Sequence, residues 1–247
     1  MPEHGPNQPL AHTRPVRRLS GMPDAADIRL LHDLPAVTVR SVSVSEMDND
    51  VYVITSKTTG AQVLIDAADD AETLRDLLAS AAADTPCEVR LDLIVTTHRH
   101  WDHIRALPAL ATVTGARTAA GADDAEAITA DTGVRPDVLL RHGDTTGVDG
   151  VELEVIALRG HTPGSVALAY RPEADEPAVL FTGDSLFPGG VGNTQGDADR
   201  FASLLADVTE RIFDRFDDDV RVHPGHGAST TLGAERPHLQ EWAERGW

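Results

Sequence analysis

Hydrophobic and polar positions alternate near the start of the chain in a way that is typical of strands. The alternation runs through residues 37–44, and short runs of β-branched residues follow at 51–54 and 62–65. Turn-forming residues at 48–50 and 58–60 separate these runs. The pattern predicts a meander of antiparallel strands.

The rest of the chain mixes short apolar runs with segments of helical spacing. The apolar runs predict strands at 91–95, 151–158, 166–170, 179–182 and 220–222. The periodic segments predict helices at 69–83, 104–113, 122–130, 201–213 and 235–244. Strands that come in groups, with helices between the groups, predict two mixed sheets packed together with helices outside them, an α+β fold.

Composition narrows the classes of partner. The 247 residues are 41% hydrophobic and 25% charged, which is ordinary for a globular protein. The net charge of −19 and the aromatic content of 4% argue against binding nucleic acid or an anionic membrane. No apolar run approaches the roughly 18 residues of a membrane span. We therefore expect neither a nucleic-acid nor a membrane partner.

The N-terminus and the cysteine content bear on location. Residues 1–23 hold five prolines and the pair Arg17 and Arg18, with no apolar segment after them. This predicts a flexible N-terminal extension rather than an export signal. Cys87 is the only cysteine, so no intrachain disulfide can form. That fits a reducing compartment, and we expect a cytoplasmic protein.

The residues that carry chemistry gather after the predicted strand 91–95. Residues 97–103 read THRHWDH. His98 and His100 are two positions apart and so project to the same side of an extended segment. A turn at Asp102 and His103, where a helix is expected to begin, can aim two more side chains inward. Imidazole and carboxylate groups bind metals. Four of them within six residues predict a metal site.

Three further segments place a histidine or an aspartate just beyond a predicted strand. They read GHTPGS (160–165), TGDSLF (182–187) and PGHG (224–227). Glycine and proline in each segment permit a tight turn and a close approach of the backbone to a ligand. Each segment alone is a weak signal, but their order behind the first cluster makes His161, Asp184 and His226 candidate ligands.

These four motifs resemble those of the metallo-β-lactamase superfamily over roughly residues 37–247. They are most similar to its glyoxalase II branch of thioester hydrolases, in the small bacterial form that resembles hydroxyacylglutathione hydrolase. The resemblance implies a four-layer αββα sandwich with a metal site at one edge of the two sheets. It also implies a hydrolase domain over residues 24–247.

A set of ligands follows from the same resemblance. It assigns His98, His100 and His161 to a first metal, Asp102, His103 and His226 to a second, and Asp184 to both. The cofactors would be two divalent ions, zinc first, with iron or manganese as alternatives. Asp66, at the end of the predicted strand 62–65, resembles a family aspartate that supports the metal loop, with a plain turn residue as the alternative.

The implied activity is metal-dependent hydrolysis of an activated acyl bond. The expected substrate is a thioester of a small thiol carrier, attacked by a hydroxide that bridges the two metals. Asp102 would be the catalytic residue that orients this hydroxide and manages its proton. β-Lactamases with a cysteine ligand place it where Asp184 stands, so lactam hydrolysis is disfavoured.

The thiol carrier and three rival functions stay open. The glutathione pocket of well-known glyoxalase II enzymes carries a lysine and a tyrosine, where this chain has Asn193 and Gln195. Their absence puts glutathione in doubt and favours another carrier, such as mycothiol. The rivals are a lactonase or other ester hydrolase, a persulfide dioxygenase with one iron on His98, His161 and Asp184, and a non-catalytic metal-binding protein. The oligomeric state is unknown.

Overall fold

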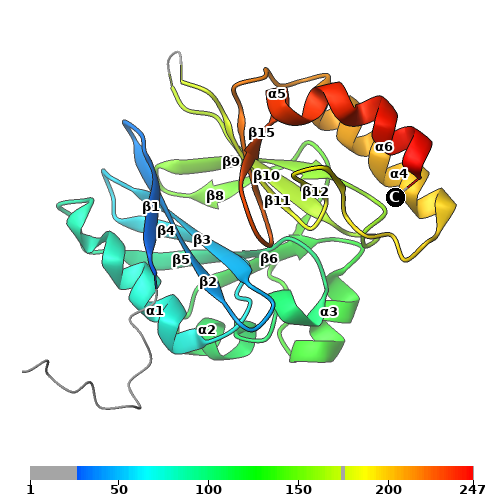
Figure 1. The fold of residues 1–247 in the computed structure, drawn as a ribbon. Coiled ribbons are helices and arrows are strands. Elements are labelled where there is room, and N and C mark those ends of the chain that lie inside the picture. The colour runs from blue at the N-terminus through cyan, green and yellow to red at the C-terminus, as the bar shows by residue number, and fades with distance from the viewer. Residues whose placement is uncertain (1–26, 174–175, 247) are drawn as a thin grey trace, which may run out of the picture.

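The computed structural model describes residues 27–173 and 176–246, so the predicted extension 1–23 lies outside the described residues. Two sheets pack face to face, and helices cover the outer face of each (Figure 1). The expected α+β sandwich of four αββα layers is confirmed.

The first sheet has seven strands in sequence order, from β1 to β7. Strands β2, β3 and β4 run antiparallel, as the alternation predicted, whereas β4 to β7 run parallel. The strands are β1 (Arg29–Asp33), β2 (Val37–Val44), β3 (Asn49–Ser56), β4 (Ala61–Ile65), β5 (Arg90–Thr96), β6 (Arg117–Gly121) and β7 (Val138–Leu140).

The second sheet has six strands in the order β15-β14-β11-β10-β9-β8. Neighbours are antiparallel except β11 and β14, which are parallel. The strands are β8 (Thr145–Val148), β9 (Val151–Ala157), β10 (Val166–Tyr170), β11 (Val179–Gly183), β14 (Arg221–Pro224) and β15 (Thr230–Thr231). A small hairpin joins β12 (Leu186–Phe187) to β13 (Gly190–Val191).

Helices form the two outer layers. The first sheet is covered by α1 (Ala71–Ser80), α2 (Leu107–Thr114) and α3 (Ala125–Thr132). The second is covered by α4 (Ala198–Val208), α5 (Leu232–Glu235) and α6 (Leu239–Arg245). No helix in the described part of the chain has the length and hydropathy of a membrane span.

Helix boundaries depart from the apolar periodicity where capping decides them. Helix α4 begins before the predicted start at residue 201 because the Asp197 carboxylate accepts hydrogen bonds from the amides of Asp199 and Arg200. The predicted helix over 201–213 ends as a π-helical turn, Thr209–Phe213. The helix expected to begin at Asp102 is a single 3₁₀ turn, with α2 following later.

The turn predicted at 48–50 lies at 45–48 instead, because Asn49 and Asp50 are the first residues of β3 and are buried. Tertiary contacts override their turn preference: Asn49 Nδ2 donates to a carboxylate far along the chain. The apolar pattern also missed β1, β6, β7 and β8 and the short strands β12, β13 and β15.

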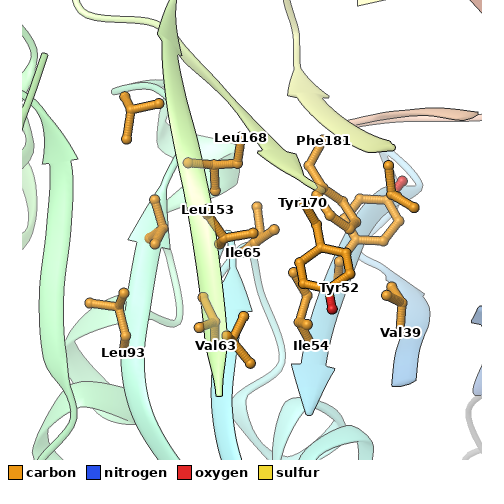
Figure 2. Packing of buried hydrophobic residues seen from close by; sticks show 14 of the residues in the cluster. Val39, Tyr52, Ile54, Val63, Ile65, Leu93, Leu153, Leu168, Tyr170 and Phe181 are labelled. Atoms are coloured by element: carbon orange, nitrogen blue, oxygen red, sulfur yellow. The ribbon is translucent and has the colours of Figure 1, made fainter. Parts of the chain in front are cut away.

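The core between the sheets is built from the inward-facing positions of both. Val63, Ile65 and Leu93 of the first sheet meet Leu153 and Phe181 of the second (Figure 2). Each of these side chains is at most 1% exposed. Burial of apolar area drives this packing at roughly 25 cal/mol per Å².

Polar contacts also join the two sheets along one edge. The amide of Asp50 donates to Gly225 O at 2.8 Å, and Tyr52 Oη donates to Pro224 O at 2.6 Å. These contacts tie the start of β3 to the end of β14. The loops after β4 and β5 leave at one edge of the first sheet, and those after β11 and β14 at one edge of the second, because the carboxyl ends of parallel strands point the same way.

A pair of histidines, of which His223 is buried, connects β1 to β14. His32 Nε2 lies 2.8 Å from His223 Nε2, and His223 Nδ1 lies 2.7 Å from Ser229 Oγ. His223 is 4% exposed. Burial, with the charges of His32 and Arg221, lowers the pKa of His223 to about 3. His223 is therefore neutral in the fold at neutral pH.

The core between the sheets generates a prediction about stability. Leu153→Ala should lower the free energy of unfolding by about 2–5 kcal/mol, because the side chain is 0% exposed and its removal leaves a cavity. Leu139→Ala is the matched control, since Leu139 is 49% exposed and its truncation should cost less than about 0.5 kcal/mol. Urea unfolding measures both. Equal losses would contradict the packing described.

The histidine pair generates a prediction about pH. The unfolded chain protonates His223 near pH 6.5 and the folded chain only near pH 3, so the stability that depends on the neutral ring is lost as the pH falls between these values. His223→Gln should flatten this part of the stability profile. Urea unfolding at several pH values measures it, with the exposed His238→Gln as control. A profile that matches the unsubstituted chain would refute the assignment.

Candidate metal centre

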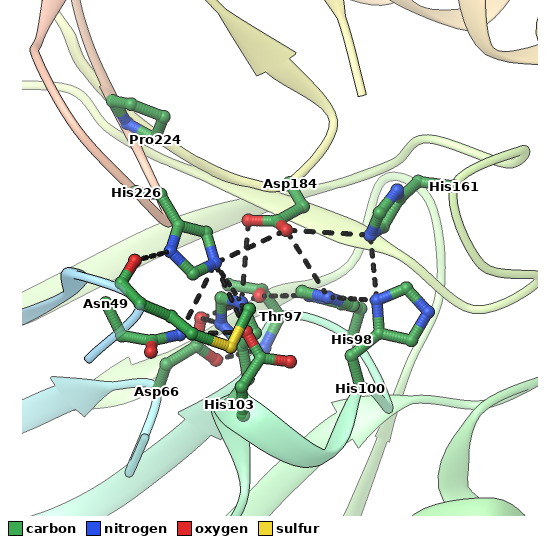
Figure 3. Close-up of polar contacts among 12 residues, drawn as sticks. Asn49, Asp66, Thr97, His98, His100, His103, His161, Asp184, Pro224 and His226 are labelled. Atoms are coloured by element: carbon green, nitrogen blue, oxygen red, sulfur yellow. Dashed lines mark hydrogen bonds and ion pairs between the residues drawn. The ribbon is translucent and has the colours of Figure 1, made fainter. Parts of the chain in front are cut away.

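Loops after four strands bring the seven candidate ligands together, and Figure 3 shows His98, His100, His103, His161, Asp184 and His226 among them. The loops follow β5, β9, β11 and β14. The side chains form two groups whose donor atoms lie within 4.8 Å of one another: His98, His100, His161 and Asp184 in the first, and Asp102, His103 and His226 in the second.

The first group surrounds one point. His100 Nδ1 lies 3.1 Å from His98 Nε2 and 3.0 Å from His161 Nε2. Asp184 Oδ2 lies 4.0 Å from His98 Nε2 and 3.7 Å from His161 Nε2. Nitrogens bound at about 2.0–2.1 Å around a tetrahedral zinc ion would be about 3.3 Å apart. The spacing therefore suits one cation.

The second group lies directly beside the first. His226 Nε2 is 3.2 Å from both His103 Nε2 and Asp102 Oδ2. Asp184 reaches this group too, with Oδ1 at 3.5 Å from His103 Nε2 and Oδ2 at 3.6 Å from His226 Nε2. The Asp184 carboxylate thus stands between the two groups.

Hydrogen bonds outside the cluster fix which ring nitrogens carry protons. His161 Nδ1 lies 2.8 Å from Asn193 O, and His226 Nδ1 lies 2.8 Å from Met47 O. A carbonyl oxygen only accepts, so Nδ1 carries the proton in both rings. In the neutral ring, Nε2 then presents a lone pair to the cluster.

The same holds for the other two rings that face inward through Nε2. Thr97 Oγ1 donates to Asp66 Oδ2 at 2.7 Å and so accepts from His98 Nδ1 at 3.1 Å. His103 Nδ1 donates to Asp66 Oδ2 at 2.9 Å. When neutral, the four imidazoles therefore turn Nε2 lone pairs toward one another. Histidine ligands of metals donate their other ring N–H in this way.

Asp184 supplies a second sign that the cluster suits a cation. Its Oδ1 is buried, and no group in the described residues donates a hydrogen bond to it. Buried polar atoms are nearly always paired, so a carboxylate oxygen that accepts no hydrogen bond and lies among imidazole nitrogens fits a positively charged partner. A Cβ on Gly225 would lie 2.4 Å from this oxygen and 2.7 Å from His103 Cε1, so only glycine leaves the space open.

The histidine pKa values differ between the two groups. Burial lowers the pKa of His98, His100 and His161, which keeps these rings neutral, as metal binding requires. Burial also acts on His103, but the carboxylates of Asp66 and Asp184 outweigh it and raise its pKa to about 10. The potential that favours a proton there equally favours a divalent cation.

Asp66 supports both groups from behind. It is 2% exposed, and its backbone takes a φ of 60°. Its carboxylate accepts from Thr97 N at 2.7 Å, as well as from Thr97 Oγ1 and His103 Nδ1. Asp66 is therefore a buried support of the loop after β5 and not an exposed turn residue.

Asn49 is a residue of the centre that the sequence pattern did not reveal. It is 0% exposed, and its Nδ2 donates to Asp102 Oδ2 at 3.0 Å. Burial raises the pKa of Asp102, but its neighbours His226, His103 and Asn49 outweigh this and hold the pKa well below its usual range. Asp102 is therefore ionised. In the sequence, Asn49 stands between two aspartates, and this pattern predicted only a turn.

Known proteins resemble this chain in sequence. The profile of the metallo-β-lactamase superfamily matches residues 45–229. A hydroxyacylglutathione hydrolase from Anaeromyxobacter dehalogenans is 36% identical over 183 residues, which cover 72% of this chain and 61% of that protein. The chain spans about half the length of other such hydrolases: 43%, 51% and 50% of those from Haemophilus influenzae, Fuscovulum blasticum and Jannaschia.

Solved structures share the fold. ETHE1 from Myxococcus xanthus matches with a TM-score of 0.67 and 29% identity, over 83% of this chain and 84% of that one. The B3 metallo-β-lactamase BLEG-1 matches with a TM-score of 0.65 and 27% identity, over 81% of this chain and 97% of that one. TTHA1623 in a di-iron-bound form matches with a TM-score of 0.59 and 29% identity, over 79% of this chain and 96% of that one. With a family profile that covers most of its length, the chain belongs to the metallo-β-lactamase superfamily.

Proposed function

We propose that this chain is a metal-dependent hydrolase that holds two divalent ions and cleaves the thioester of a small thiol carrier. The observation that carries the proposal is the convergence of four imidazole Nε2 atoms on the Asp184 carboxylate, whose Oδ1 is buried and accepts no hydrogen bond from the described residues. His98, His100 and His161 would hold the first ion, Asp102, His103 and His226 the second, and Asp184 both.

The donor set suits water activation. Divalent ions on such nitrogen and oxygen ligands lower the pKa of water from 15.7 toward about 7, so that a nucleophile is available at neutral pH. Addition of water across the acyl C–S bond yields a carboxylic acid and a thiol. The reaction needs no oxidant and no serine or cysteine nucleophile. Zinc fits the ligands, and iron or manganese would fit them too.

Asp102 is the protein group proposed to act on the attacking water. Asn49 Nδ2 and His226 Nε2 both lie against its Oδ2, which leaves Oδ1 to accept a hydrogen bond from water. Because its pKa is well below the usual range, Asp102 orients the water as an ionised acceptor and stores a proton poorly. We assign it an orienting role.

The thioester class rests on relatives and on Asp184. Proteins named hydroxyacylglutathione hydrolase match the chain at 33–36% identity. The carboxylate of Asp184 stands between both groups of ligands, where β-lactamases with a cysteine ligand place the thiol. The match to a B3 metallo-β-lactamase supports the fold, and a lactam in the substrate panel tests that activity directly.

The carrier depends on the loop that contains Asn193 and Gln195. Gln195 N donates to Asn193 Oδ1 at 2.7 Å, and Gln195 Oε1 accepts from Arg200 Nη1 at 3.2 Å. Both side chains are uncharged, and both are engaged within the protein. They supply neither the cation nor the aromatic ring of the glutathione pocket in well-known glyoxalase II enzymes. We therefore favour a different thiol carrier, such as mycothiol.

A mono-iron persulfide dioxygenase is the second candidate, and the match to ETHE1 from Myxococcus xanthus favours it. Such a site needs only His98, His161 and Asp184. Here a complete second group lies beside the first, with Asp102 6% and His103 0% exposed. The second group favours two ions, in keeping with a neighbour solved in a di-iron-bound form.

Metal analysis and a substrate panel test the proposal together. The purified chain should contain two divalent ions per molecule and hydrolyse a thioester faster than a lactone or a lactam. A chelator should abolish the activity, and zinc or manganese should restore it. One iron per chain with oxygen consumption would favour the dioxygenase instead. A chain that binds no transition metal would overturn the proposal.

Substitution of His98 tests whether this residue is a metal ligand. His98→Ala should lower kcat/KM for the thioester by more than about a hundredfold and reduce the metal content, because His98 is a proposed ligand. His238→Ala is the matched control: this ring lies on the surface, with its side chain 53% exposed, and both values should be unchanged. Retention of metal and activity by His98→Ala would remove this residue from the ligand set.

The carrier is tested by two thioesters that share one acyl group. The mycothiol thioester should give the higher kcat/KM, because Asn193 and Gln195 offer no charge or ring to glutathione. Faster turnover of the glutathione thioester would refute the assignment of the carrier and leave the thioesterase proposal intact.

A further inference from the structure

A buried carboxylate outside the four motifs lies directly behind the first group of ligands. Asp124 is 0% exposed and occupies the position that precedes α3. An aspartate at such a position usually accepts a hydrogen bond from the first turn of its own helix. In the described structure the Asp124 side chain makes no such bond. Its oxygens face two loops of the metal centre instead.

The contacts of Asp124 join these two loops. Oδ2 accepts from Arg99 N at 3.1 Å and from Thr162 Oγ1, and Oδ1 accepts from Gly164 N at 3.0 Å. Arg99 lies between His98 and His100 in the chain, and Thr162 follows His161 directly. One carboxylate therefore links the segments that carry all three histidines of the first group.

The backbone packs closely around Asp124 and the loop after β9. A Cβ on Gly164 would lie 2.4 Å from Asp124 N and 2.8 Å from Asp124 Cβ, and a Cβ on Gly121 would lie 1.8 Å from Gly164 O. The loop after β9 thus rests directly on the residues around Asp124. Burying a carboxylate costs free energy unless it is hydrogen-bonded, so the fold favours keeping these donors against Asp124.

We propose that Asp124 is a positioning residue for the first ion: it sets the spacing between the His98–His100 segment and His161. The inference rests on the proposed function. None of the contacts described for Asp124 reaches the loops that carry Asp184 and His226. Loss of its carboxylate should therefore weaken the first group and leave the second largely intact.

Cobalt titration of the metal-free full-length chain tests this inference, because cobalt bound to nitrogen and oxygen ligands has a visible spectrum. Asp124→Asn keeps the size of the side chain, but its amide nitrogen accepts no hydrogen bond, so the variant loses either the bonds from Arg99 N and Thr162 Oγ1 or the bond from Gly164 N. We expect one cobalt ion to bind as in the unsubstituted chain and the other about ten- to a hundredfold more weakly. The spectrum of the first site should change with it.

Asp84→Asn is the matched control. The Asp84 carboxylate accepts from Thr38 Oγ1 and from the Arg40 guanidinium, toward the end of β2 that is remote from the ligand loops. This variant should lose stability without a change in the cobalt titration. Thermal melting of each metal-free variant shows that it is folded.

The outcomes separate the inference from the proposed function. If the unsubstituted chain binds no cobalt or zinc, the proposed function fails and the inference with it. If it binds two ions and folded Asp124→Asn binds both with unchanged affinity, or loses both equally, only the inference fails. If Asp124→Asn does not fold, Thr162→Val removes one donor alone. That variant should weaken the first site severalfold, and an unchanged affinity would overturn the inference.

Discussion

Four imidazole Nε2 atoms converge at one edge of the sandwich, because each of these rings donates its Nδ1–H to a fixed acceptor. The acceptors are Asp66, Thr97 and the carbonyls of Met47 and Asn193. In the neutral rings such an arrangement places lone pair against lone pair, which is unfavourable unless a proton or a metal cation lies among them. The rest of the centre, including the unpaired oxygen of Asp184, is consistent with this one requirement.

The sandwich provides the rigidity that this arrangement needs. Ligand loops leave the carboxyl ends of strands in both sheets, so a shift of one sheet against the other would separate the two groups. Contacts from Asp50 to Gly225 and from Tyr52 to Pro224 prevent that shift at the edge itself. The apolar layer between the sheets fixes the same relation from inside. Stability of the core and geometry of the centre are therefore coupled.

Carboxylates have two different tasks in this acidic chain of net charge −19. Asp102 and Asp184 face the inside of the cluster and are the acidic candidate ligands. Asp66 and Asp124 lie behind it and accept hydrogen bonds from the loops that carry histidines. Buried charge is tolerated in both cases because donors or a cation surround it. The supporting pair determines where the ligands stand.

The sequence by itself determined the meander and the candidate ligands, because both are recorded locally: strand alternation has a period of two, and each motif pairs its ligand with a turn. Only the tertiary structure decided the roles of Asn49 and Asp124. Asn49 meets Asp102 across 53 positions, and Asp124 meets Gly164 across 40. A pattern of neighbours cannot contain such contacts, which exist only once the two sheets have packed and brought the strand ends to one edge.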